Sequence, residues 1–267
     1  MLQFPSARRF LSSIGNPSLM DKMRRTLPER KAVDGISKVI MVGSGKGGVG
    51  KSTVAANLAI SLARNGATAG LLDADIYGPS VPMLLGLHGA PEYKDGRIQP
   101  FEKHGIKALS IGSLSKGGAI VWRGLLVMKA LQQLVRDVNW GKLDYLVVDL
   151  PPGTGDVHLS LIQTIPIDAA VLVTTPQSIS WIDVQKAAQM FELAKISVLG
   201  YVQNMSVVEC PKCTHHFDLF PNKSADFTDY KCLLKLPFEP KIGKNSDEGL
   251  PVDSHFDGLA QYVIQNV

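Results

Sequence analysis

Residues 43–53 read Gly-Ser-Gly-Lys-Gly-Gly-Val-Gly-Lys-Ser-Thr, a spacing that suits phosphate binding. The pattern Gly-x-x-x-x-Gly-Lys-Ser lies within this run and ends at Ser52. Glycines let backbone N–H groups turn toward phosphate oxygens, Lys51 adds a positive charge, and the Ser52 hydroxyl can bind Mg²⁺. We therefore predict a site for ATP with Mg²⁺, made by Gly45, Lys46, Gly47, Gly48, Val49, Gly50, Lys51, Ser52 and Thr53.

Carboxylates follow two apolar runs elsewhere in the chain. Asp149 precedes a Pro-Pro-Gly turn, where it can hold Mg²⁺ through water, opposite Ser52. Asp73 and Asp75 follow the other run. We expect Asp75, which lies further into its loop, to orient or deprotonate the water that attacks the γ-phosphate. The alternative is that both aspartates only cap the following turn. Lys46, Lys51 and Asp75 are thus the candidate catalytic residues.

Cys210 and Cys213 form a Cys-x-x-Cys pair, which can place two thiolates on one soft metal ion or cluster. Zinc and iron–sulfur sites usually need four ligands. His215 and His216 follow too closely to form a zinc-finger loop. Cys232 is the only other thiol, and the sequence does not fix where its segment lies in the fold. The pair is therefore expected to be half of a site that a symmetric dimer completes. A redox dithiol and two idle thiols are the alternatives.

The elements that must position these side chains alternate between strand and helix. Before the glycine-rich run stands an apolar stretch of buried-strand length, and after it an Ala/Leu-rich helical pattern. This alternation predicts an α/β fold: a doubly wound, mostly parallel sheet with helices on both faces, as in P-loop NTPases. We expect strands at 38–42, 67–72, 106–111, 143–148, 169–174 and 198–202, and helices at 53–64, 125–138 and 180–195.

The 267 residues divide into a leader and one domain. Residues 1–20 contain arginine and serine but no acidic residue, which is typical of a mitochondrial presequence; an untargeted basic tail is the alternative. Residues 21–37 form a charged linker, and 38–267 a single P-loop ATPase domain with a metal loop near 210–213. The three cysteines fit a reducing compartment. The histidines, His158 among them, show no metal-site spacing and are expected at the surface or in loops.

Composition also excludes some partners. The formal net charge is +4, but no arginine-rich cluster with interleaved aromatic residues is present, so nucleic acid is not an expected partner. No apolar run is long and uninterrupted enough to span a bilayer, so no integral membrane segment is expected.

Three runs together resemble the Mrp/ApbC family of MinD-type P-loop ATPases, which assemble iron–sulfur clusters. They are Gly45–Thr53, Asp73–Ser80 and Asp149–Asp156. The Tyr-Gly-Pro-Ser stretch in the second run separates this family from cell-division and partition ATPases. The chain departs from the family pattern at Gln203, where an acidic residue is usual, and at Thr214, where glycine is common. The stretch 217–237 is also shorter than in the family.

The resemblance implies roles for particular residues. Lys46 would reach across a homodimer to the partner's nucleotide, Asp75 would lie in switch I and Asp149 in switch II. Asn204 would contact adenine, and Cys210 and Cys213 would bridge a [4Fe-4S] cluster between two subunits.

Three functions are weighed. The first is an ATP-binding, weakly hydrolysing carrier that passes a [4Fe-4S] cluster to apo iron–sulfur proteins. With the leader, the resemblance is to the mitochondrial branch, which acts in the matrix during assembly of respiratory complex I. The second is a MinD/ParA-like positioning ATPase, but residues 258–267 are too uncharged for a membrane-binding helix. The third is a zinc-stapled dimeric chaperone ATPase.

Overall fold

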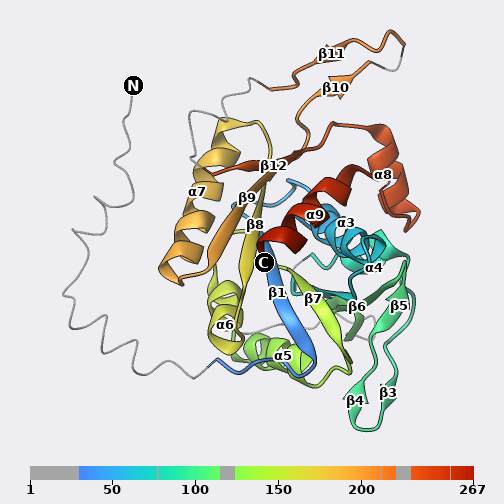
Figure 1. Cartoon of the computed structure of the whole chain (residues 1–267), viewed down its shortest axis with the longest axis vertical. Helices are drawn as coiled ribbons and strands as arrows, with labels where there is room; N and C mark the ends of the chain where they lie inside the picture. Colours follow the sequence, from blue (N-terminus) through green and yellow to red (C-terminus); the bar gives the residue numbers. More distant parts are fainter. Residues whose placement is uncertain (1–29, 77, 115–123, 211, 221–229, 253) are drawn as a thin grey trace, which may run out of the picture.

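The computed structural model describes residues 30–76, 78–114, 124–210, 212–220, 230–252 and 254–267. Their main feature is an eight-stranded sheet in the order β12-β9-β8-β1-β7-β2-β6-β5 (Figure 1). Neighbouring strands are parallel except for the edge strand β5, which is antiparallel to β6. The strands are β1 Ile36–Ser44, β2 Ala69–Asp73, β5 Phe101–Lys103, β6 Ile106–Ser110, β7 Leu143–Asp149, β8 Ala169–Thr174, β9 Ser197–Gln203 and β12 Cys232–Lys235.

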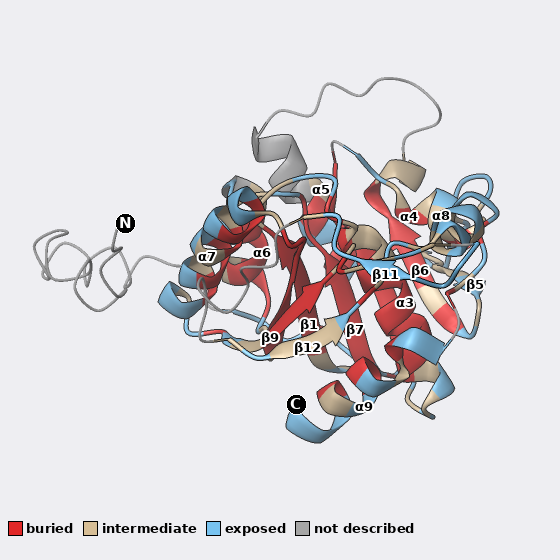
Figure 2. Ribbon diagram, turned by 90° about the horizontal axis from the view of Figure 1, so that it is seen from above, coloured by how far each residue is buried: buried red, intermediate tan, exposed pale blue. Residues whose placement is uncertain are grey.

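Helices cover both faces of this sheet, so the central strands are buried on both sides (Figure 2). One core cluster lies between the sheet and α3 (Lys51–Arg64), α4 (Val81–Leu85) and α9 (Asp257–Asn266). The other lies against α5 (Gly124–Arg136), α6 (Asp156–Thr164) and α7 (Ser178–Leu193). Strands that are buried on both faces are near-continuous apolar runs, as in parallel sheets generally. The predicted fold class, a doubly wound and mostly parallel α/β sheet, is confirmed.

Several smaller elements were not predicted. The stretch 86–105, expected as an exposed excursion, contains the hairpin β3 (Tyr93–Lys94) and β4 (Arg97–Ile98) as well as β5. A second hairpin, β10 (Val208–Glu209) and β11 (His216–Phe217), projects beyond β12 and α8 (Pro240–Asp247) (Figure 1). Short 3-10 turns occupy Ile111–Leu114 and Ser254–Phe256. These pieces are too short for hydrophobic periodicity to reveal them.

The predicted leader, residues 1–20, and most of the predicted linker lie outside the described residues. The first described residues pack on the domain, since Val33 is buried in the core and β1 begins at Ile36, two residues earlier than predicted. In the described part of the chain, no helix has the length and apolar character needed to cross a bilayer.

Candidate functional site

The glycine-rich loop joins the end of β1 to the start of α3, at the carboxyl edge of the sheet where doubly wound folds bind ligands. Gly50 precedes α3 with φ 86°, a left-handed conformation that glycine adopts without strain. Gly45 passes so close to α7 that an added Cβ atom would lie 2.1 Å from the carbonyl carbon of Asp183. The sequence thus folds this loop tightly, with its open side at the N-terminus of α3, the end of a helix that favours anions.

The loop borders a cavity of about 480 Å³. Side chains of Lys46, Lys51 and Ser52 line it from the loop and α3, while Asp75 and Pro152 line it from the loops after β2 and β7. The structure therefore brings three predicted catalytic residues and a predicted magnesium ligand into one space. Val49 instead points into the core and anchors the loop.

Lys51 lies among carboxylates. Its Nζ donates a hydrogen bond to Asp149 Oδ1 at 2.6 Å and lies 3.7 Å from Asp75 Oδ2. All three residues are buried. Burial raises the pKa of Asp149 above its ordinary value, although the ammonium group of Lys51 opposes this shift. In this arrangement the lysine serves as counter-ion to the acids that surround the phosphate site.

The residues fit a magnesium ion. Lys51 Nζ also lies 3.3 Å from Ser52 Oγ, so the hydroxyl and the Asp149 carboxylate face the same small space. Asp149 Oδ2 is buried and has no hydrogen-bond partner among the described residues. A hydroxyl and a buried carboxylate oxygen are the hard ligands that Mg²⁺ prefers. Bound there, the ion would neutralise charge on phosphate oxygens.

Asp73 and Asp75, of which the sequence favoured Asp75 as the catalytic residue, differ in their surroundings. Asp73 accepts hydrogen bonds from the backbone N–H of Asp75 at 3.0 Å and of Val81 at 3.3 Å, and from Ser110 Oγ at 2.9 Å. It therefore braces the loop after β2. Asp75 lines the cavity beside Lys51. This geometry favours Asp75 for contact with bound nucleotide, and its catalytic role stays a prediction.

Burial, helped by the nearby charge of Asp149, raises the pKa of Asp73 from 3.8 to about 7. The folded chain therefore holds this proton more tightly than the unfolded chain does, and the resulting stability is present in full below about pH 4, is lost as pH rises from there to about 7, and stays level above that. Between about pH 4 and about pH 7, we expect the free energy of unfolding of the nucleotide-free protein to fall by up to about 1.4 kcal/mol per pH unit. Asp73→Asn should remove this component, as measured by urea unfolding from about pH 5 to about pH 8.

Ser110→Ala is the matched control, because it deletes one hydrogen bond to the carboxylate and leaves the titrating group in place. It should keep the wild-type slope. Equal pH slopes for the wild type and Asp73→Asn would contradict the assignment of the proton to Asp73.

Lys46 is held within its own chain. Its Nζ donates a hydrogen bond of 2.9 Å to Gln177 Oε1, and Gln177 directly precedes α7. The Gln177 carbonyl also accepts hydrogen bonds from the backbone of Ser180 and Trp181 in the first turn of that helix. Sequence reasoning missed Gln177 because no motif marks it. The only signal was Lys46 itself, because a lysine inside a phosphate loop needs a hydrogen-bond or charge partner.

Asn204 lies behind the loop. Its Nδ2 donates to the Val49 carbonyl at 2.9 Å, and an added Cβ at Gly50 would lie 2.2 Å from the same nitrogen. The side chain therefore fixes the position of the phosphate loop relative to β9. Its predicted contact with adenine stays a prediction.

His158 differs from expectation. It was predicted at the surface or in a loop, but it lies in α6 and is 1% exposed. Burial, with a smaller contribution from Lys51, lowers the pKa of His158 to about 4, so the ring is neutral near pH 7. The prediction was wrong because no helix was predicted at Asp156–Thr164, so the burial of its inner face was not foreseen.

Cys210 and Cys213 lie apart from the cavity, in the turn of the β10–β11 hairpin. The Cys210 N–H donates to the His215 carbonyl, and the Thr214 N–H donates to the Cys210 carbonyl, both at 2.9 Å. Hydrogen bonds from the backbone of Lys212, and then from the thiol and backbone of Cys213, lower the pKa of the Cys210 thiol. Thiolate sulfur is a ligand that soft metals prefer, and the metal role of this pair stays a prediction.

The described residues offer Cys210 and Cys213 no third metal ligand. Among the described residues, no group of three or more His, Cys, Asp or Glu side chains is placed to hold a metal ion. Cys232 lies in β12, where it is partly buried against the core and its Sγ is 3.8 Å from the Leu234 carbonyl. It thus occupies a packing position in the sheet.

Comparisons with known proteins agree with this geometry. A family model described as ParA: NUBPL iron-transfer P-loop NTPase matches residues 35–266. The iron-sulfur cluster transfer protein NUBPL of Mus musculus is 50% identical over 238 residues, which are 86% of this chain and 75% of the mouse protein. The iron-sulfur cluster carrier protein of Aquifex aeolicus is 48% identical over 231 residues, 84% of this chain but only 64% of that protein.

Solved structures share the fold. A nucleotide-binding protein from Archaeoglobus fulgidus, determined in complex with ADP, is 39% identical with a TM-score of 0.74, covering 85% of this chain and 92% of that one. The septum site-determining protein MinD from Pyrococcus horikoshii, with Mg-ADP, is 24% identical with a TM-score of 0.65, covering 85% and 96%. The second likeness shows the fold alone. The resemblance stated from the sequence is confirmed: the chain belongs to the NUBPL iron-transfer P-loop NTPase family.

Proposed function

We propose that this protein is an ATP-dependent carrier that holds a [4Fe-4S] cluster between two copies of the chain and passes it to apo iron–sulfur proteins. One observation carries the proposal: a chain of the iron-transfer family places two adjacent thiols, Cys210 and Cys213, in the turn of an exposed hairpin. A carrier needs its cargo at the surface, where another protein can reach it. The cluster is thus the substrate of this site.

ATP is the proposed control. Lys46, Lys51 and Asp75 line the cavity at the phosphate loop, a geometry suited to weak hydrolysis. Lys46 would leave Gln177 to reach the nucleotide of a second copy, which ties ATP to the homodimer. The mitochondrial matrix is the proposed compartment, supported by the composition of residues 1–20, and subunits of respiratory complex I are the proposed recipients.

The two alternatives are weaker. A MinD/ParA-like positioning role is supported only by a likeness of fold to MinD. A zinc-stapled chaperone would use the same half-site, so metal analysis separates it from a cluster carrier. Zinc without sulfide in protein isolated anaerobically from its native compartment would favour that third function.

Anaerobic reconstitution tests the proposal. The wild type should bind iron and sulfide at one cluster per two chains, whereas Cys210→Ala and Cys213→Ala should bind none and lose dimer content. Both variants should keep their ATP affinity, because the hairpin lies outside the phosphate cavity. Iron and sulfide are measured chemically, and dimer content is measured by sedimentation.

Cys232→Ala is the matched control, since its thiol is partly buried in β12. It should retain the cluster. Unchanged iron and sulfide in Cys210→Ala would rule out the hairpin as the cluster site.

A further inference from the structure

The cysteines lie in the two-stranded β10–β11 hairpin, which a single bridge joins to the segment after β12; together they are called here the ribbon, and it has two different faces. β10 pairs with β11, in the register Val208 to Phe217, and also forms a parallel bridge to the segment after β12, in the register Val208 to Phe238. The Phe238 N–H donates to the Val207 carbonyl at 2.7 Å, which secures this segment. Directly opposed residues in a sheet lie on the same face. Val208, Phe217 and Phe238 therefore form one row, called here the apolar row.

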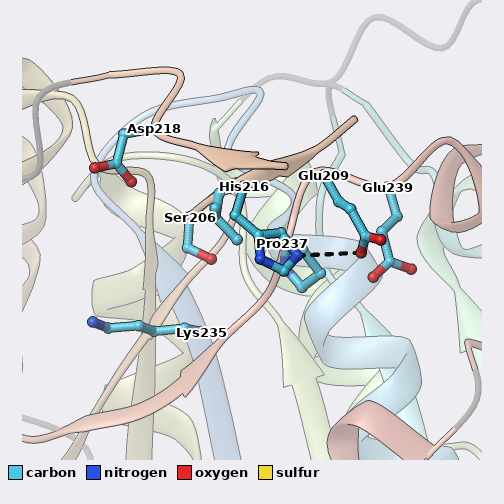
Figure 3. A pocket seen from close by; sticks show the side chains of 8 residues that line it. Ser206, Glu209, His216, Asp218, Lys235, Pro237 and Glu239 are labelled. Carbon is cyan, nitrogen blue, oxygen red and sulfur yellow. Dashed lines mark ion pairs between the residues drawn. The ribbon is translucent and has the colours of Figure 1, made fainter. Parts of the chain in front are cut away.

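The opposite face of the ribbon is polar and mainly acidic. Glu209 and His216 are opposed and form an ion pair at 3.3 Å, as Figure 3 shows. Glu239 and Asp218 lie with them around a cavity of about 370 Å³. Residues of the two faces alternate along each strand, as the period of two in a β-strand requires.

The apolar row is open to solvent. Phe217 is 45% exposed and Phe238 is 46% exposed, and Val208 is only partly buried between them. The row is a small apolar patch that a second surface can cover, and its size alone does not mark an interface. This row begins two residues before Cys210, so whatever binds a metal at the cysteines lies next to it.

We propose that the apolar row is the surface on which a second copy of this chain docks when metal is bound at Cys210 and Cys213. This inference rests on the proposed function, because it takes the cysteine pair as half of a shared site. No described residue of the same chain supplies a third ligand, so the missing thiolates come with a second hairpin. A two-fold axis through the metal places the same surface of each copy in contact.

Charge decides which face of the ribbon makes this contact. The cavity on the opposite face is lined by three carboxylates, Glu209, Asp218 and Glu239, against one lysine, Lys235. Two copies of this face would therefore bring net negative charges together, and like charges at an interface repel each other. The apolar row carries no charge and buries aromatic surface against its own copy. The row is therefore the face that two copies can share.

The contact is small. Two half-exposed phenylalanines offer roughly 200 Å² per chain, or roughly 400 Å² for a pair, against about 1,200–2,000 Å² in a stable interface. The row therefore does not hold two copies together without metal. Docking should depend on both the metal and the row, so that loss of either one returns the chain to monomer.

The test compares Phe217→Thr and Phe238→Thr with the wild type. Threonine favours strands, so the ribbon is kept while the ring is lost. The control is Tyr93→Thr, because Tyr93 is an aromatic residue, 73% exposed, on the separate β3–β4 hairpin. Each full-length protein is loaded anaerobically with iron and sulfide, and separately with Zn²⁺, and its dimer dissociation constant is measured by sedimentation over a dilution series.

We expect both phenylalanine variants to raise the dimer dissociation constant about tenfold or more with either metal, and the control to leave it unchanged. Cluster content in these variants should recover at high protein concentration, in contrast to the cysteine variants. Dimers as tight as wild type in both phenylalanine variants would overturn the docking surface and leave the carrier function standing. A wild type that takes up no iron and sulfide, but whose zinc dimer is weakened by the variants, would overturn the carrier function alone. No dimer with either metal would overturn both.

Discussion

Replacing Lys51 with alanine is expected to weaken ATP binding by about 100-fold or more, because it removes the cation that meets the phosphates in a partly buried cavity. The same change should destabilise the nucleotide-free protein. Asp149 and Asp75 are buried and would lose the ammonium group of Lys51, which lies 2.6 Å from Asp149 Oδ1 and 3.7 Å from Asp75 Oδ2. Breaking a buried pair in this way typically costs about 3–5 kcal/mol.

The stability loss should depend on pH. Without Lys51, burial of Asp149 is no longer opposed by a nearby ammonium and its pKa rises further, so protonation of this carboxyl relieves part of the cost as pH falls, and the deficit is larger at high pH than at low pH. Calorimetric titration with ATP and urea unfolding at two pH values measure the two effects. Lys46→Ala serves as the control for stability, since Lys46 contacts Gln177 and is not paired with the buried acids. Normal ATP affinity in Lys51→Ala would contradict the phosphate-loop assignment.

Gly45→Ala is expected to be the most disruptive single methyl addition in the phosphate loop. The added carbon would lie 2.1 Å from the backbone of Asp183 in α7, and backbone cannot move aside as a side chain can. Either the loop or α7 must shift, so we expect a loss of about 1–3 kcal/mol in stability together with loss of ATP binding. Thermal unfolding without nucleotide and a separate ATP titration measure these two outcomes.

Gly47→Ala is the matched control for stability. A Cβ atom there would meet no described atom closer than 4.0 Å, the distance to Pro152 Cγ, so the melting temperature without nucleotide should stay near that of the wild type. Equal melting temperatures for Gly45→Ala and Gly47→Ala would show that the close approach to α7 does not matter.

The central fold was predictable from sequence because its strands are buried on both faces. β1, β2, β7 and β8 contain apolar runs of strand length, and each is followed by a turn or loop. The edge strand β12 was missed because its four residues alternate little and end at Lys235. The C-terminal helix α9 was missed because its apolar face becomes evident only when it packs on α3.

The candidate site was predictable in its residue types but not in its contacts. From the sequence, Gly45 was explained by the freedom that glycine gives backbone N–H groups to turn toward phosphate. The structure adds a second reason, because α7 passes too close for any side chain at this position. The pairing of Lys51 with Asp149 joins residues 98 positions apart, and no local pattern encodes such a distance. Gln177 was missed for the same reason. Motifs identify chemical groups, and the topology of the sheet decides which groups meet.

The β10–β11 hairpin of the ribbon has a further consequence, which concerns release of a cluster from the proposed site. From Val207 to Phe220, none of the described residues is buried, and β10 and β11 are joined over only two residue pairs. Segments with little buried surface open locally, at a free-energy cost far below that of global unfolding. Opening of this ribbon would loosen the ligands at Cys210 and Cys213 while the nucleotide cavity, set in the doubly covered sheet, stays folded. On the proposed function, retention of the cluster and integrity of the fold would then follow separate equilibria in one chain.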